Sequence, residues 1–262
     1  MAKENMNKLS LKEVAFKMNE ILFLTCFPVA ISFSEEEKLP PKARRPIDSV
    51  GYPLAICQGI NMARNLGWTI GFLKEDHCCP PSFIILGLQA EPEDYPLSEA
   101  LYPRYCETPD ICASNNKNLA TLPLGKYKSI VVAPLAKATY EPDLILVYGN
   151  PAQISRLIHS ALYLNDESIK STFLGRNSCA PALVDPFLSG HCKVIVPGSG
   201  ERVFASTQDH EMCFAIPGTR LNEVIYGLDK THAQGTMRYP TPFHGMRLEP
   251  KFPEKLQGIK RF

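Results

Sequence analysis

Two segments with the same local order constrain the fold of this chain more than any other feature. Residues 67–88 contain a short apolar run, a polar turn with two cysteines and a helix that begins at proline, and residues 169–188 repeat this order in weaker form. Both segments place a cysteine before a helix, as Cys79-Pro80-Pro81 and as Cys179-Ala180-Pro181. A helix N-terminus favours a thiolate over a thiol because its N–H groups are unpaired and its dipole is positive there. The two turns therefore predict where a chemical site lies.

The elements around the two turns predict an internal duplication. A Gly-x-Pro helix start at Gly51 precedes the first turn, and another at Gly149 precedes the second. Alternation of helical and strand-like patterns favours an α/β or α+β fold with a mixed sheet and flanking helices. We expect one compact domain over 1–262 with a pseudo-repeat of 28–90 by 129–190, which would bring the two cysteine turns together.

Hydrophobic periodicity predicts the individual elements. Helices are expected over 9–23, 53–64, 80–88, 151–164 and 221–228. Strands are expected over 28–33, 68–74, 129–133, 143–148, within 192–205 and over 212–216. The glycines of 197–202 predict a turn between two strands rather than a phosphate loop. Residues 89–128 read as an irregular lid or insertion, because prolines and polar residues interrupt every pattern there.

Composition and charge exclude several classes of protein. The 262 residues carry a formal net charge of +1, whereas a nucleic-acid surface usually shows a clear basic excess. The apolar run over 21–33 contains Pro28, is too short to span a bilayer and lacks a signal-peptide cleavage pattern. We therefore expect a cytoplasmic protein with a small-molecule substrate or a redox partner, and the sequence leaves its oligomeric state open.

Nine cysteines are many for such a chain. Their odd number and the absence of an export signal argue against a disulfide framework and favour metal or redox chemistry. Cys26 and Cys213 lie inside apolar runs and are expected to be small core residues.

The chain resembles a known family, the domain-of-unknown-function family 169 of archaea and anaerobic bacteria. The resemblance covers most of the chain and rests on these motifs: Ile56-Cys57-Gln58, Glu75-Asp76-His77-Cys78-Cys79-Pro80, Leu86-Gly87-Leu88, Tyr148-Gly149-Asn150-Pro151, Gly175-Arg176-Asn177-Ser178-Cys179, Gln208-Asp209-His210-Glu211-Met212, Phe214-Ala215-Ile216-Pro217 and Arg238-Tyr239-Pro240. It implies no established reaction. It does imply that Cys57, Cys79 and Cys179 are the family-type cysteines, with Cys106, Cys112 and Cys192 as additions in this chain.

Three cysteines from separate turns and a helix end suit an iron–sulfur cluster. We expect Cys57, Cys79 and Cys179 to hold a [4Fe-4S] cluster and to leave one iron open. The candidates for a fourth ligand are Cys78, Cys192, His77 and His210. The open iron would serve a redox or a Lewis-acid role.

Other interpretations of the same cysteines stay open. One is a zinc site, although the short paired spacings of structural zinc sites are missing. Another is a metal-free thiol enzyme in which His77 or His210 activates Cys79. A third is a non-catalytic cluster carrier or accessory subunit. The donors of Arg176, Asn177 and Ser178 would bond to cluster sulfurs or to a substrate anion, or would serve ordinary turn geometry.

Overall fold

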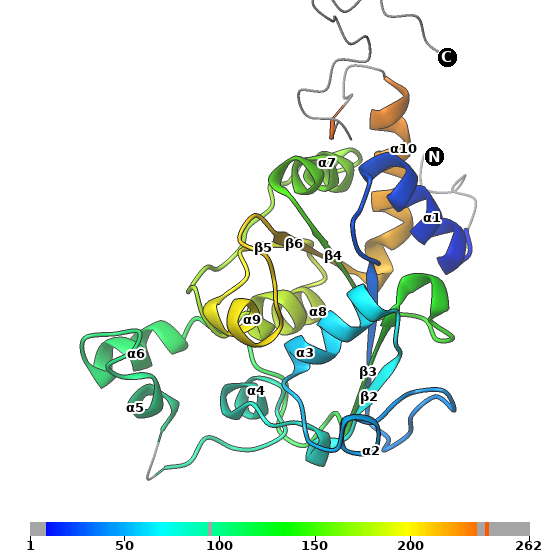
Figure 1. Ribbon diagram of the computed structural model, residues 1–262. Helices are drawn as coiled ribbons and strands as arrows, with labels where there is room; N and C mark the ends of the chain where they lie inside the picture. The colour runs from blue at the N-terminus through cyan, green and yellow to red at the C-terminus, as the bar shows by residue number, and fades with distance from the viewer. Residues whose placement is uncertain (1–8, 94–95, 235–238, 241–262) are drawn as a thin grey trace, which may run out of the picture.

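A single sheet forms the centre of the molecule (Figure 1). The computed structural model describes residues 9–93, 96–234 and 239–240, so the predicted extent of the domain, 1–262, reaches beyond them at both ends. The sheet has six strands in the order β2-β3-β1-β4-β6-β5. The strands are β1 (Val29–Ser34), β2 (Ile70–Phe72), β3 (Ser129–Pro134), β4 (Leu144–Gly149), β5 (Lys193–Ile195) and β6 (Met212–Pro217).

Each pair of neighbouring strands runs antiparallel. In the described residues, parallel pairing occurs in two isolated bridges, Arg44 with Ile70 and Leu54 with His77. The predicted α+β class is therefore confirmed. The sequence predicted a mixed sheet with parallel and antiparallel strands, whereas the paired strands of the structure are all antiparallel.

Helices surround this sheet and follow the predicted pattern closely where the periodicity is strong. The described α-helices are α1 (Leu11–Leu22), α2 (Pro46–Val50), α3 (Ile56–Asn61), α4 (Pro80–Ile85), α5 (Leu97–Leu101), α6 (Pro109–Asn116), α7 (Pro151–Leu162), α8 (Asp185–Ser189), α9 (Ser199–Phe204) and α10 (Leu221–Ala233). Two π-helical turns extend them: Met62–Leu66 follows α3, and Ala180–Val184 precedes α8. Among the described helices, none has the length and apolarity that a membrane span requires.

Both faces of the sheet are covered, as β4 shows. Its six residues are all buried, with Leu144 and Leu146 in the core on one face and Ile145 and Val147 in the core on the other. Helix α3 and the turn Ala180–Val184 pack against the first face, whereas α1, α7 and α10 pack against the second. Because both faces of β4 are buried, its sequence is a continuous apolar run and does not alternate between apolar and polar residues.

The described elements do not show the predicted duplication of 28–90 by 129–190. The strand order is symmetric about the β1–β4 pair, but this symmetry relates β1, β2 and β3 to β4, β5 and β6 and not the segment 28–90 to 129–190. A twofold axis between antiparallel neighbours stands perpendicular to the sheet and would keep equivalent helices on one face. Helices α3 and α7, which the predicted repeat would make equivalent, cover opposite faces, and residues 169–174, at the start of the second cysteine segment, form no strand.

Two further segments differ from their predictions. Residues 197–202 were expected to turn between two strands, but α9 begins at Ser199, directly after the short strand β5. The expected irregular segment 89–128 contains α5 and α6, which stand at the outer edge of the molecule in Figure 1. A disulfide joins Cys106, in the loop between α5 and α6, to Cys112 in α6, so disulfide bonding is present as a single bridge and not as a framework.

Candidate functional site

Cys57, Cys79 and Cys179 line one cavity of about 280 Å³, which we name the thiol cavity. They come from three separate elements: Cys57 is the second residue of α3, Cys79 is the N-cap of α4, and Cys179 directly precedes the turn Ala180–Val184. The negative charges of Cys57 and Cys79 both act to raise the pKa of Cys179, because the three sulfur atoms lie near one another. The structure thus brings together the three cysteines that the family resemblance favoured.

Local sequence fixes the first of these positions. The Ala55 N–H donates to Gln58 Oε1 at 2.9 Å, which closes the start of α3 next to Cys57. Gly59, one turn further, lies against the ring of Phe72 in β2, and a Cβ at this position would overlap the ring. Helix α3 can therefore approach β2 closely enough to present Cys57 to the thiol cavity.

Cys79 does not have the helix N-terminus that the sequence predicted for it. Helix α4 has six residues, and its first two positions are Pro80 and Pro81. Proline has no N–H, so the unpaired donors that would stabilise a thiolate are missing at the first two positions. The Ser82 hydroxyl instead donates to the Cys79 carbonyl at 2.8 Å and fixes the turn. The prolines therefore position Cys79 rather than activate it.

Burial keeps two of the three thiols protonated. It raises the pKa of Cys57 to about 12, and the charges of Glu201 and Cys79 add to the effect. Burial also raises the pKa of Cys179 well above its ordinary value, with further contributions from Cys79 and Cys57. Neither sulfur is a free thiolate at neutral pH. A bound metal centre would change this, because a coordinating thiol is deprotonated outright.

Glu201 is the acidic residue of the thiol cavity, and it was missed from the sequence. It is buried, and its Oε1 accepts a hydrogen bond from the Tyr148 hydroxyl at 2.8 Å. Its Oε2 accepts from the Gly198 N–H at 3.4 Å. The available signal was a glutamate three residues after a helix-capping glycine, a spacing typical of a helix start. This spacing was not recognised because residues 197–202 were interpreted as a turn between two strands.

Arg176 and Asn177 line the thiol cavity from the loop that leads into Cys179. The Arg176 side chain is buried, and its Nη2 donates to Asn116 Oδ1 at 3.0 Å. Its guanidinium carbon lies 5.8 Å from the centre of the Tyr105 ring. The Tyr105 and Ser199 hydroxyls are 2.7 Å apart, so the segment between α5 and α6 closes over the cavity onto α9.

The four candidates for a fourth ligand lie outside the lining of the thiol cavity. Cys78 is exposed beside Cys79, and His210 is exposed on the loop before β6. His77 is buried and stacks on Phe72, with 4.7 Å between ring centres. Cys192 belongs to the core on the opposite face of the sheet.

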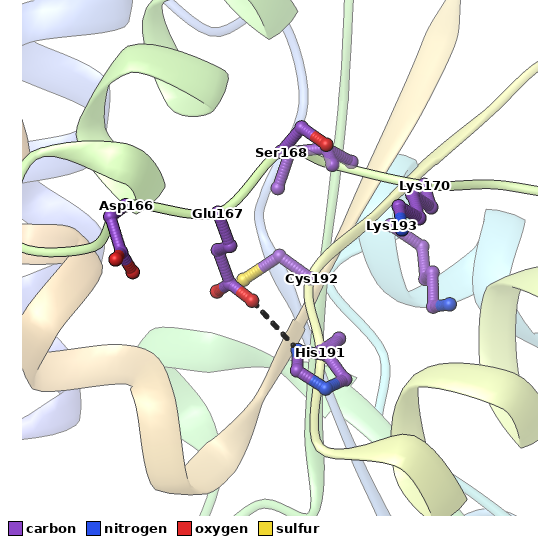
Figure 2. A pocket seen from close by; sticks show the side chains of 8 residues that line it. Asp166, Glu167, Ser168, Lys170, His191, Cys192 and Lys193 are labelled. Atoms are coloured by element: carbon purple, nitrogen blue, oxygen red, sulfur yellow. Dashed lines mark ion pairs between the residues drawn. The ribbon is translucent and has the colours of Figure 1, made fainter.

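Cys192 lines a second cavity, of about 390 Å³ (Figure 2). Glu167 lines this cavity and forms two ion pairs. One of its carboxylate oxygens lies 3.2 Å from His191 Nδ1, and the other lies 2.6 Å from Arg220 Nη1. Burial raises the pKa of Cys192 to about 12, although the charge of Arg220 opposes this. Glu167 is thus paired with two basic side chains, and the buried thiol of Cys192 lines the same cavity.

The donor set of the thiol cavity fits an iron–sulfur cluster. In the part of the chain that the structure describes, no group of three or more His, Cys, Asp or Glu side chains forms a site for a metal ion. Ligands of one zinc ion converge on a single atom, whereas the thiolates of a [4Fe-4S] cluster bind different irons. The three thiols of the thiol cavity provide soft ligands of the kind that an iron–sulfur cluster takes.

Comparison with known proteins places the chain in a family. A family profile described as Uncharacterised ArCR, COG2043 (DUF169) matches residues 17–227, which include Cys57, Cys79 and Cys179. The chain belongs to the DUF169 family. This confirms the predicted resemblance, and the match extends over all six strands. Neither the curated proteins nor the solved structures gave a match to this DUF169 protein.

Proposed function

We propose that this DUF169 protein binds a [4Fe-4S] cluster in the thiol cavity through Cys57, Cys79 and Cys179. The supporting observation is that three soft ligands from three separate elements meet at one partly enclosed cavity. The fourth iron would have no cysteine ligand, since none of the cavity's other lining residues is a cysteine or a histidine. A cluster with an open iron supplies electron transfer or Lewis-acid chemistry.

The surroundings of the thiols argue against a metal-free enzyme in which Cys57 or Cys179 is the nucleophile. A nucleophilic cysteine needs a lowered pKa, whereas burial raises the pKa of Cys57 and Cys179. His77, the proposed activating base, stacks on Phe72 and does not line the thiol cavity. A zinc site and a non-catalytic carrier remain the alternative proposals.

The surrounding residues define what the chain itself does at this site. Glu201 holds a hydrogen bond from Tyr148 and supplies a carboxylate beside the thiols. Tyr105 and Phe204 add aromatic side chains to the lining of the cavity. A cluster of this kind suits the cytoplasm of a cell with an anaerobic metabolism, with a small-molecule substrate or a redox partner at the cavity mouth.

Anaerobic purification followed by a visible spectrum and an assay of iron and sulfide tests this proposal. We expect a broad band near roughly 400 nm with about four irons and four sulfides per chain. Cys57→Ser, Cys79→Ser and Cys179→Ser should each remove the band and most of the iron, because each thiolate holds one iron of the cluster.

Cys78→Ser is the matched control, since Cys78 is exposed and adjacent to Cys79. It should keep the full band. A full band in any of the three ligand variants would exclude that ligand, and an iron-free, colourless wild-type protein would refute the proposal. A zinc assay of that colourless protein would then separate the zinc alternative from free thiols.

A further inference from the structure

A third cavity opens between α1, the loop that leads from α1 to β1, and the turn Met62–Leu66 that follows α3. Its volume is about 540 Å³, within the range of roughly 300–1,000 Å³ that is usual for small-molecule sites. It shares no lining residue with the thiol cavity. Half of its lining residues are apolar, and we name it the phenylalanine cavity after two of them: Ala15, Phe16, Leu24, Phe27, Pro28 and Ala136.

Two aromatic rings of the phenylalanine cavity are exposed to solvent. Phe16 in α1 is 70% exposed, and Phe27 in the loop before β1 is 49% exposed. Single exposed apolar side chains are common on protein surfaces, but two rings that line one cavity form an apolar surface that a ligand can cover. The lining therefore favours a ligand with an apolar body.

Hydrogen bonds of the backbone hold the walls of this cavity in place. The Phe27 N–H donates to the Arg64 carbonyl at 2.9 Å, which ties the loop to the turn after α3. On the other wall, Gln153 Nε2 donates to the carbonyls of Leu22 and Phe23 at 2.9 and 3.0 Å, which fixes the end of α1. The cavity is therefore formed in advance, so a ligand has little ordering of the chain to offset.

The charges of the phenylalanine cavity favour an anion. Lys12 and Arg64 are its charged lining residues, and the described residues that line it include no aspartate or glutamate. Arg64 is already paired with Glu211, at 2.7 and 3.0 Å, whereas the Lys12 side chain has no ion pair or hydrogen bond among the described residues. The thiol cavity and the Cys192 cavity differ, because Glu201 lines the first and Glu167 the second.

We infer that the phenylalanine cavity binds a small amphipathic monoanion, with its apolar body on Phe16 and Phe27 and its anionic group at Lys12. This ligand site goes beyond the proposed cluster and does not depend on it, because the two cavities have no residue in common.

Isothermal titration calorimetry of the full chain with octanoate tests this inference. Octanoate joins an apolar chain to one carboxylate, and at constant ionic strength it should bind saturably, with one molecule per chain. Octanol has the same chain without the charge and should bind about two- to fivefold more weakly, the range of an exposed ion pair. Octylammonium carries the opposite charge and should bind more weakly than octanol.

Two substitutions in α1 separate the charge from the apolar surface. Lys12→Gln should reduce the affinity for octanoate to that for octanol and leave octanol binding unchanged. Asn19→Trp places a large ring at a lining position and should abolish the binding of both compounds. Lys17→Gln and Asn222→Trp are the matched controls, because Lys17 lies in α1 and Asn222 is exposed in α10, and neither lines the cavity. Both controls should bind octanoate as wild type does.

Several outcomes would overturn the inference. They are the absence of saturable octanoate binding in wild type, equal binding by Asn19→Trp and Asn222→Trp, and octylammonium binding as tight as that of octanoate. Sedimentation of the same samples tests a different occupant: a wild-type dimer that Asn19→Trp dissociates, without octanoate binding, would assign the cavity to a second copy of the chain.

The cluster variants separate this inference from the proposed function. Cys79→Ser should lose the visible band and still bind octanoate as wild type does. A coloured wild-type protein that does not bind octanoate would refute the ligand site and leave the cluster. A colourless wild-type protein with Lys12-dependent octanoate binding would refute the cluster and support the ligand site.

Discussion

At the scale of single residues, His77 shows how the fold sets the charge of a side chain. Its ring stacks on Phe72 and lies edge-on to Phe83, and Nδ1 has no partner among the described residues. Burial lowers the pKa of His77 to about 4, although the charge of Asp76 opposes this. The ring is therefore neutral at pH 7 in the folded protein.

This burial predicts a loss of stability in mild acid. Below pH 6.5 the unfolded chain gains a proton on His77 that the folded protein does not accept until about pH 4. The free energy of unfolding should therefore fall as pH drops from 6.5 towards 4, by at most about 1.4 kcal/mol per pH unit for one proton. Urea unfolding of wild type and His77→Phe at several pH values measures this difference.

The control for that series is His210→Gln, since His210 is exposed. It should keep the wild-type slope, whereas His77→Phe should flatten it. Equal slopes in wild type and His77→Phe would show that His77 does not titrate in this way. Glu211, whose pKa lies below its ordinary value, titrates at lower pH and contributes little to this window.

Sequence reasoning identified the cysteines of the site and the donors of Arg176, Asn177 and Ser178, but it missed Glu201. Cys57, Cys79 and Cys179 stood out because a thiol beside a turn or a helix start is a recognisable pattern. Glu201 carries no such pattern. Its importance comes from its burial and from its hydrogen bond with Tyr148, and both are properties of the assembled fold.

At the scale of elements, one glycine decides how closely two helices pack. Helices α7 and α10 lie side by side on one face of the sheet, and Gly227 of α10 meets the Ser160 carbonyl of α7. A Cβ at Gly227 would overlap this carbonyl oxygen. The helix pair can therefore exist at its present spacing only with glycine at this position.

Gly227→Ala should lower the free energy of unfolding by about 1–3 kcal/mol, because the helices must separate or the backbone must shift. Chemical denaturation measures the effect. Gly200→Ala in α9 is the control, since the nearest atom to its Cβ would lie 4.0 Å away. That change should be neutral or stabilising by up to about 1 kcal/mol, as for Gly to Ala in an open helix. Equal effects of the two changes would contradict the packing argument.

Helices were predicted well where the hydrophobic periodicity extends over several turns and a capping residue marks the helix start. Helix α7 combines an apolar stripe with Asn150, whose side chain accepts from the Gln153 N–H at 3.0 Å, and both signals are visible in the sequence. Helix α9 has only six residues, too few to display a helical period, and its glycines predicted a turn. Short helices of this kind are decided by tertiary contacts.

At the scale of the whole molecule, a buried ion pair joins parts of the chain that are distant in sequence. Arg64, at the end of the α3 segment, pairs in bidentate fashion with Glu211, which directly precedes β6. The Arg64 guanidinium also lies 4.2 Å from the centre of the Tyr148 ring, whose hydroxyl donates to Glu201. The pair is thus connected through Tyr148 to Glu201, which lines the thiol cavity.

Glu211→Gln should destabilise the protein by about 3–5 kcal/mol, because it leaves Arg64 charged, buried and unpaired. Equilibrium unfolding in urea at pH 7 measures this loss. Asp229→Asn is the comparison: the Lys17–Asp229 pair has a similar distance, 3.0 Å, but is exposed, and its loss should cost less than about 1 kcal/mol. A loss in Glu211→Gln no larger than in Asp229→Asn would show that the buried pair is not needed.

The arrangement of the sheet could not be predicted from the sequence. The strands themselves were recognisable as apolar runs, but β1 pairs with β3 and β4, which lie about a hundred residues further along the chain. Such pairings depend on how all the helices cover the two faces. The expected duplication is not shown for a related reason: the local order repeats along the sequence, but α3 and α7 cover different faces of the sheet.

The position of β1 has a consequence for the protein while the ribosome is still making it. The first strand synthesised lies near the centre of the sheet, and both of its neighbours emerge much later. At about 5–20 residues per second, the nascent chain waits several seconds with an apolar strand unpaired. Cys57 and Cys79 emerge long before Cys179, so the proposed cluster could bind all three cysteines only after Cys179 has left the ribosome. Until the neighbours of β1 emerge, the nascent chain exposes strand edges of the kind that pair with other chains.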